Sequence, residues 1–228
     1  MLHILWVLIG YLMGSIPFAY LAGRLMRGID IRRYGTHAVT GSNVYENVSR
    51  PAVVVVGLLD MGKAALPTWL GLRLGLGLPT ALASGLAAVV GHNWPLYLGF
   101  HGGRGIGSCL GVLTVAFPLG FPWMLVALAI GRLLRNPVMP LVGFVTLPML
   151  AHITGQPPAM VWACVGMFFL IVAKRLEANR EPLPPGSERW RVLARRLLLD
   201  RDIEDWETWA HRRPENSTPD QKRGGTQC

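Results

Sequence analysis

The sequence is dominated by apolar runs that approach the length needed to cross a lipid bilayer. A transmembrane helix needs about 20 predominantly apolar residues, and residues 2–23, 51–72 and 77–98 meet that requirement. Further apolar runs at 137–154 and 157–173 are separated by the turn-like GQPP. Only 15% of the residues are charged, whereas a soluble domain carries about a quarter. The sequence therefore predicts an all-α, polytopic membrane protein.

The stretch 106–131 decides how many times the chain crosses the membrane. Its centre holds PLGFP, so it forms either one span or two short spans that meet there. With one span the total is six, and the polar tail lies on the opposite side from the first basic loop. With two short spans the total is seven, and every basic loop residue except Arg73 lies on the side of the tail. Because cytoplasmic loops are enriched in Lys and Arg, we predict seven transmembrane helices, with the N-terminus outside and the C-terminus cytoplasmic.

The positive charge of the chain belongs mainly to its apolar part. Of the 22 Lys and Arg residues, ten lie before position 174, together with only three of the 13 acidic residues. A nucleic-acid-binding protein would place a basic stripe on a folded soluble face, so we predict a lipid bilayer as partner and no nucleic acid. The first apolar run has no basic residue before it, and Arg24 and Arg27 follow it. We therefore expect a membrane helix there and not a cleaved signal.

The polar tail divides into parts. We place a membrane domain at 1–180, followed at 181–211 by the Pro-rich break EPLPPGS and an amphipathic helix, and by a disordered tail at 212–228. In the helix, arginines alternate with Trp190, Leu193 and Leu197. Two interpretations stay open: a basic helix on the cytoplasmic membrane surface, or a helix packed on the cytoplasmic loops.

The sequence carries no familiar metal-binding or nucleophile pattern. It has neither a Gly-x-Ser-x-Gly elbow nor a Cys-x-x-Cys pair, and we expect no metal and no cofactor. Its three cysteines are scattered, and we interpret them as packing residues: Cys109, Cys164 and Cys228. Its histidines lack the spacing of metal ligands. Asp60 and Lys63, three residues apart inside an apolar run, are expected to pair.

Two polar, glycine-rich segments interrupt the apolar chain: 29–50 and 99–108, the second preceded by GHNWPLYL at 91–98. Backbone N–H groups in a glycine-rich turn, together with an arginine fork, can hold an anion. Alternatively, glycines in a membrane protein let helices pack closely. We assign 71–79 and 81–91 to packing, and 101–107 to anion binding because that stretch also contains Arg104.

Four ordered motifs carry a resemblance to a known family. They are GSIPFAYLAGRLMRGIDIRRYGT, TGSNVYENV, LLDMGKAALP and GHNWPLYLGFHGGRGIGSCLGVL, spread over about residues 10–180. In these motifs the chain resembles the bacterial acyl-phosphate:glycerol-3-phosphate acyltransferases of the PlsY type. The resemblance implies a seven-span inner-membrane enzyme that makes lysophosphatidate from acyl phosphate and glycerol 3-phosphate in phospholipid biosynthesis, with its site facing the cytoplasm.

The resemblance also implies roles for particular residues. Carried over by motif, the catalytic residues are Thr36, Asn43, Arg104 and Asn179. The expected substrate- and phosphate-binding residues come from the same segments and the first motif: Ser15, Arg32, Gly35, Ser42, His92, His101, Gly102, Gly103 and Gly105. The chain departs from the family motifs conservatively at Thr36 and Arg104, which stand for serine and lysine. The larger departures are His37 for glycine, Ala38 for asparagine, Glu46 for arginine and Leu176 for histidine.

The predicted function is therefore acyl transfer from acyl phosphate to glycerol 3-phosphate. The departures leave one alternative, a non-catalytic membrane protein that binds anionic lipid or regulates an acyltransferase. A small transporter is a weaker alternative, because few charges lie within the apolar runs. The sequence leaves the oligomeric state open.

Overall fold

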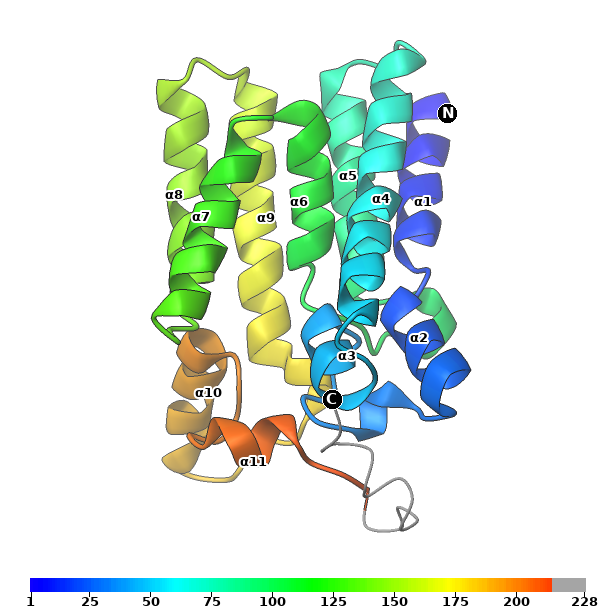
Figure 1. The fold of residues 1–228 in the computed structure, drawn as a ribbon. Helices are drawn as coiled ribbons and strands as arrows, with labels where there is room; N and C mark the ends of the chain where they lie inside the picture. The colour runs from blue at the N-terminus through cyan, green and yellow to red at the C-terminus, as the bar shows by residue number, and fades with distance from the viewer. Residues whose placement is uncertain (215–228) are drawn as a thin grey trace.

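The structure is a computed structural model that describes residues 1–214. Every regular element in that range is a helix (Figure 1). The α-helices, in chain order, are α1 (Leu2–Gly14), α2 (Phe18–Arg27), α3 (Gly41–Asn47), α4 (Ala52–Arg73), α5 (Leu78–Asn93), α6 (Ile106–Ala116), α7 (Gly120–Leu133), α8 (Met139–Ile153), α9 (Pro158–Glu177), α10 (Glu188–Leu199) and α11 (Trp206–Ala210). Three short 3-10 helices lie between them: η1 (Ile31–Arg33), η2 (Leu96–Leu98) and η3 (Ala178–Arg180).

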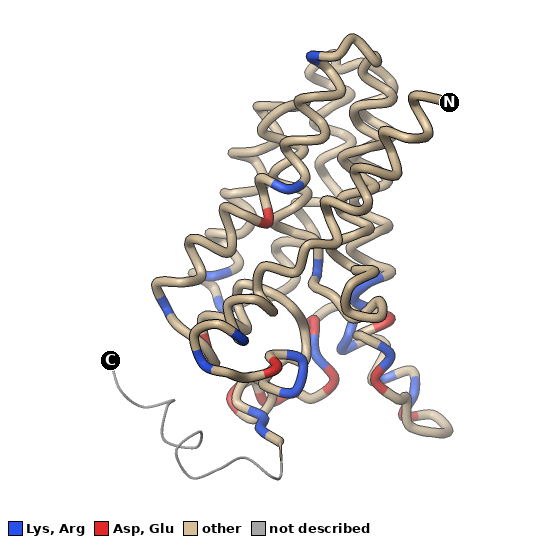
Figure 2. The backbone as a smooth tube through the Cα atoms, turned by 90° about the vertical axis from the view of Figure 1, so that its right-hand side faces the viewer, with Lys and Arg blue, Asp and Glu red and all other residues tan. Residues whose placement is uncertain are grey.

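The helices form a bundle with a polar cap at one end. Helices α1 and α4 to α9 run side by side, whereas α2, α3, α10 and α11 gather at the end of the bundle remote from the N-terminus (Figure 1). Helix α5 packs on α1, α4, α6 and α9, and α8 packs between α7 and α9. The charged residues are concentrated at the capped end (Figure 2).

Small residues let α1 and α5 approach closely, as predicted for 81–91. A Cβ atom added at Gly14 would overlap the backbone of Ala88, and one added at Gly91 would overlap the carbonyl of Tyr11. The packing assignment is wrong for part of 71–79. Gly75 and Gly77 have φ of +70° and +81° with no tight neighbour, so they form the left-handed turn between α4 and α5.

Two of the apolar runs are each divided into two helices at a segment that contains a proline, Pro17 in the first and Pro118 in the second. The prediction that 106–131 forms two helices is confirmed, since α6 ends at Ala116 and α7 begins at Gly120. The single helix expected over 2–23 is wrong: α1 ends at Gly14 and α2 begins at Phe18. Pro17 has no N–H to continue the α1 ladder.

The outer surface of the bundle is apolar. Three stretches are long and apolar enough to cross a membrane, at Leu2–Arg27, Ala52–Arg73 and Pro158–Arg180, and three shorter apolar helices accompany them. Large apolar side chains point outward from these helices, among them Ile4, Leu8, Val54, Leu58, Trp162 and Phe169. A continuous apolar exterior of this kind is what a lipid bilayer covers.

A group of charged side chains is buried between α4, α5 and the α1–α2 bend. The expected pair forms, with Lys63 Nζ 2.9 Å from Asp60 Oδ1. Lys63 also donates to the carbonyl of Ile16 at 2.9 Å, and His92 Nδ1 lies 3.4 Å from the same Asp60 oxygen. Because each charge has a partner, the group ties α4 to α5 and to the α1–α2 bend.

The cysteines that the structure describes act as packing residues. Cys109 and Cys164 are buried, unbonded to each other, in the main core cluster. Cys228 lies outside the described residues, as do residues 215–228 of the segment predicted to be disordered.

Candidate functional site

The first polar loop, residues 28–40, is shaped by Asn43. The Asn43 side-chain amide donates to the carbonyls of Ile31, Tyr34 and Ala38 at 2.9–3.1 Å. Its oxygen accepts from Asn47 at 2.8 Å. Asn43 is fully buried, so its contacts support the loop from inside. We see it as a positioning residue for the neighbouring Thr36.

The start of α3 and the Arg32 side chain complete this loop. Thr40 caps α3 and lies 3.1 Å from the hydroxyl of Ser42. The Arg32 guanidinium binds both carboxylate oxygens of Asp30, at 3.0 and 2.7 Å. Burial of Asp30 opposes its ionisation, but hydrogen bonds from Arg32 and the charges of Arg32 and Arg24 outweigh it, so the pKa of Asp30 lies below its ordinary 3.8.

The second loop, residues 99–105, is packed too tightly for any residue but glycine at several positions. A Cβ atom at Gly102 would overlap the carbonyl of His92, and one at Gly103 would overlap the His92 ring. Gly103 N donates to His92 O at 3.0 Å, and Val39 N donates to Gly102 O at 3.1 Å. These glycines therefore pack the second loop between the end of α5 and the first loop.

The end of α9 joins the two loops. Asn179 has a left-handed backbone, with φ of 55°. Its side-chain amide donates to the carbonyl of His37 in the first loop at 3.1 Å and to that of Gly102 in the second loop at 3.2 Å. One residue at the end of α9 thus connects the first loop to the second.

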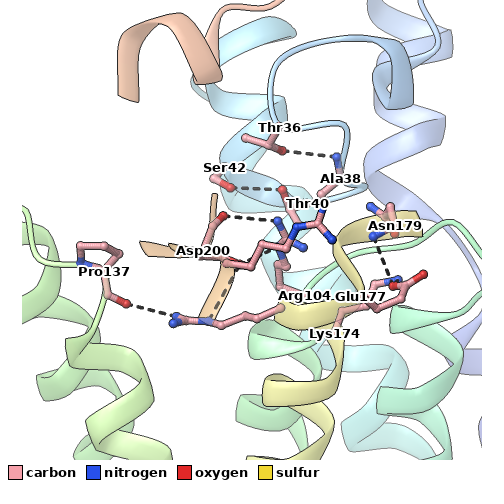
Figure 3. Close-up of polar contacts among 12 residues, drawn as sticks. Thr36, Ala38, Thr40, Ser42, Arg104, Pro137, Lys174, Glu177, Asn179 and Asp200 are labelled. Carbon is pink, nitrogen blue, oxygen red and sulfur yellow. Dashed lines mark hydrogen bonds and ion pairs between the residues drawn. The ribbon is translucent and has the colours of Figure 1, made fainter. Parts of the chain in front are cut away.

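A small cavity opens where these three segments meet. Thr36 and Arg104 line it, together with the end of α9 and residues of the C-terminal part of the chain: His37, Arg175, Ala178, Glu181, Arg196, Asp200, Arg201, Asp202, Trp209 and Arg212. Arg104 Nε lies 3.0 Å from the Asp200 carboxylate, and Arg104 Nη2 donates to the Asp200 carbonyl at 3.4 Å (Figure 3). Arg104 therefore holds an anionic group in the cavity.

Residues 188–214 contribute to the cavity, which is not evident from the sequence. Helix α10 packs on α9 and buries Val192 and Arg196, whereas Trp190 is 72% exposed. Helix α10 thus packs against the polar end of the bundle, through α9 and through Arg196, which donates to the carbonyls of Leu176 and Glu181. The expected continuous helix is interrupted between α10 and α11, at Asp200–Asp205.

Two of the departures from the family motifs acquire partners in this part of the chain. Glu46 Oε2 lies 3.7 Å from His211 Nε2. The carbonyl of Leu176 accepts from Arg196 Nη1 at 3.3 Å. Ala38 is buried and its carbonyl is bound by Asn43.

Lys174 is a further buried cation that sequence reasoning missed. It is 0% exposed and lies 2.8 Å from Glu177 (Figure 3). Its Nζ also lies 5.1 Å from the centre of the Trp94 ring. The signal available in the sequence was a lysine directly after the apolar run 157–173.

The remaining expected site residues lie at the edges of this region. Gly35 (φ +53°) belongs to the first loop and Gly105 (φ +81°) caps α6. Ser15 donates to Tyr11 O at the α1–α2 bend, and His101 contacts Gly99 O. None of Ser15, Arg32, His92 and His101 lines the cavity with Arg104. Within residues 1–214, no three His, Cys, Asp or Glu side chains come together as metal ligands.

Comparison with known proteins gives concordant matches. The sequence model of the glycerol-3-phosphate acyltransferase family matches residues 4–182. Glycerol-3-phosphate acyltransferase 5 of Dehalococcoides mccartyi (strain ATCC BAA-2266 / KCTC 15142 / 195) is 34% identical over 96% of this chain and 96% of its own. Glycerol-3-phosphate acyltransferase of Synechococcus sp. (strain CC9902) is 37% identical over 81% of this chain and 93% of its own.

A solved structure has the same fold. It is the crystal structure of PlsY (YgiH), an integral membrane glycerol 3-phosphate acyltransferase, in its glycerol 3-phosphate form. The TM-score is 0.70 and the identity 26%, over 78% of this chain and 90% of that one.

Proposed function

The chain belongs to the glycerol-3-phosphate acyltransferase family and is an integral membrane acyltransferase, and from that premise we propose that it transfers an acyl group from acyl phosphate to glycerol 3-phosphate. The observation that carries this proposal is Arg104, whose guanidinium lies in the cavity beside Thr36 and already holds a carboxylate. A guanidinium fork binds phosphate oxygens in the same way. The non-catalytic alternative is not favoured.

The reaction needs positioning more than a strong base. A hydroxyl oxygen of glycerol 3-phosphate attacks the acyl carbonyl carbon, a C–O ester bond forms, and the bond from that carbon to the phosphate oxygen breaks. The departing phosphate takes the hydroxyl proton, so lysophosphatidate and inorganic phosphate are the products. Holding both reactants in line supplies much of the rate enhancement in such a transfer.

We assign roles to the site residues on this basis. Arg104 binds the phosphate group of a substrate, and the Thr36 hydroxyl, which lines the same cavity, binds the acceptor. Asn43 shapes the first loop, and Asn179 holds it against the second. The glycines of the second loop let it pack against the first loop, which brings Arg104 close to Thr36. We propose supporting roles in substrate binding for the other predicted residues: Ser15, Arg32, Gly35, Ser42, His92, His101, Gly102, Gly103 and Gly105.

Turnover by purified protein tests the assignment. Wild-type protein in detergent is expected to convert acyl phosphate and glycerol 3-phosphate to lysophosphatidate without added metal or cofactor. Arg104→Ala is expected to lower kcat/KM at least 100-fold, because a charge-assisted contact to phosphate is lost. Arg73→Ala, at the far end of α4, is the control. Equal inactivity of wild type and Arg104→Ala would contradict the proposal.

We further propose that the chain crosses the inner membrane seven times, through α1 and α4 to α9, with the N-terminus outside and the site facing the cytoplasm. The concentration of charge at the capped end supports this orientation (Figure 2). We place the membrane domain at 1–180 and the cytoplasmic cap at 181–211, with 212–228 as a tail. Single cysteines at Arg73 and at Arg191 should react with a membrane-impermeant reagent from opposite sides of sealed vesicles. Labelling of both from one side would contradict the seven-span arrangement.

A further inference from the structure

The C-terminal segment, residues 188–214, supplies part of the cavity although it lies outside the family match at 4–182. Five of its residues, Arg196, Asp200, Arg201, Asp202 and Arg212, bring charge to the cavity wall. Helices α10 and α11 lie under the polar end of the bundle (Figure 1). The segment therefore forms one wall of the site.

The far end of the segment is fixed to the first loop of the site. Gly35 N donates to the carbonyl of Arg212 at 2.8 Å, and Asn47 donates to that of Ala210 at 3.2 Å. Between them, His211 lies 3.7 Å from Glu46. These three contacts hold the backbone of Arg212 beside the loop that carries Thr36.

The cavity carries an excess of positive charge. Its lining contains five guanidinium groups and three carboxylates. Arg196 pairs with Asp202 at 2.6 Å, and Arg175 donates to the carbonyls of Leu197 and Pro137. Arg104 lies 3.0 Å and Arg175 3.9 Å from the Asp200 carboxylate. The last two, Arg201 and Arg212, form no ion pair within the described residues.

The unused hydrogen-bond donors of the cavity belong to three arginines. Arg104 Nη1, Arg201 Nε, and Arg212 Nε and Nη2 are buried with no hydrogen-bond partner in the described part of the chain. Buried polar groups are almost always hydrogen-bonded, and an arginine fork fits the oxygens of a phosphate. The only anion beside Arg104 in this part of the chain is the Asp200 carboxylate, at 3.0 Å.

We propose that Arg201 and Arg212 bind the phosphate group of a substrate together with Arg104, and that this phosphate displaces the Asp200 carboxylate from Arg104. The ligand class is a phosphate monoester or acyl phosphate dianion. Its identification as a substrate rests on the proposed function. A charged ligand that replaces Asp200 leaves the three arginines in place and satisfies their free donors.

At least one relative aligns with this chain across the C-terminal segment. A match to 96% of the chain, as in the Dehalococcoides mccartyi relative, leaves out too few residues to miss 188–214. The Synechococcus relative matches 81% of the chain. Relatives that share the segment are the ones in which we expect the additional arginines to bind phosphate.

Direct binding of inorganic phosphate tests the proposal without turnover. Calorimetric titration of the purified full chain in detergent at fixed ionic strength should show binding to wild type. Arg212→Gln and Arg201→Gln should each weaken that binding about 10- to 100-fold, the loss typical of a charge-assisted hydrogen bond. Arg191→Gln removes the same charge from an exposed position of α10 and should bind phosphate like wild type. Asp200→Asn should bind phosphate more tightly, because the competing anion is gone.

Steady-state kinetics then distinguish the source of the phosphate. The KM for glycerol 3-phosphate and the KM for acyl phosphate are measured separately in each variant, and the one that rises identifies the substrate held by the segment. Arg212→Lys, which keeps the charge, should bind phosphate more tightly than Arg212→Gln and more weakly than wild type. If Arg212→Gln does not fold, the phosphate affinity and KM values of Arg212→Lys test the role of Arg212 instead.

The outcomes separate this proposal from the proposed function. If wild type makes lysophosphatidate and the phosphate affinity and KM values of Arg201→Gln and Arg212→Gln equal those of wild type, the role of Arg201 and Arg212 is overturned and the acyltransferase assignment stands. Arginine-dependent phosphate binding without any lysophosphatidate would overturn the proposed reaction and support the binding site. Wild type that binds no phosphate overturns the proposal.

Discussion

Replacing Asn179 with alanine measures how strongly the end of α9 holds the two loops of the site together. The substitution removes two hydrogen bonds, to the carbonyls of His37 and Gly102, each contributing about 0.5–1.5 kcal/mol. It also places a Cβ-bearing residue without a local hydrogen bond at φ of 55°, which adds about 1 kcal/mol. We therefore expect the free energy of unfolding to fall by about 2–4 kcal/mol.

Thermal unfolding in detergent and turnover together check this value. For a chain of this size 1 kcal/mol corresponds to about 2–4 °C in Tm, so the Tm of Asn179→Ala should fall on the order of 10 °C. Asn179→Gly also loses both hydrogen bonds but accepts the left-handed backbone, so it should recover part of that loss. In turnover, kcat should fall in both variants because Thr36 and Arg104 are no longer held in register. A Tm within 1 °C of wild type and unchanged kcat in both variants would refute the proposed link.

Three further changes test the packing around the site. Gly103→Ala should abolish accumulation of folded protein, since its Cβ would overlap a buried histidine ring; normal yield and monodisperse elution would contradict this. Lys63→Met should destabilise by about 3–5 kcal/mol by leaving Asp60 buried without its partner, and the double variant with Asp60→Asn should lose less than the sum, as a double-mutant cycle in thermal unfolding will show. Because the pKa of Asp30 is lowered in the folded state, its contribution to stability is present above about pH 4 and is lost as pH falls through the folded pKa. The Tm difference between wild type and Asp30→Asn should therefore shrink below pH 3.8, and a difference that grows on acidification would contradict that sign.

The apolar helices followed from the sequence because length and hydropathy are local properties. The apolar run predicted at 51–72 corresponds to α4 within one residue at each end, and the break between α6 and α7 lies in PLGFP. The bend at Pro17 was missed because proline can also lie at the first turn of a helix or kink a continuous one. The turn at Gly75 and Gly77 could not be distinguished from a packing seam, because the sequence does not show whether a glycine has a positive φ.

The cap was the part that the sequence could not place. An amphipathic helix with interleaved arginines has the same pattern whether its apolar face meets lipid or protein, and only the structure shows that Arg196 is 2% exposed and bound to three backbone carbonyls and Asp202. The partner of Glu46, His211, could not be identified from the sequence because it lies near the other end of the chain. A catalytic role is predicted for Asn43 from the motif, whereas its side-chain contacts in the structure are to the loop itself.

The docking of Arg212 beside Gly35 has a consequence for the order in which the protein is made. Both polar loops and α9 leave the ribosome before α10 and α11, so the bundle can insert and close around its core while the wall formed by residues 196–212 is still absent. A nascent or prematurely stopped chain that ends after α9 therefore presents Arg104 without Asp200 and an open, unneutralised cavity. The site is complete only after residues 196–212, which follow α9 in the chain, have been translated and have packed. Insertion of the bundle into the membrane and completion of the site are therefore separate in time.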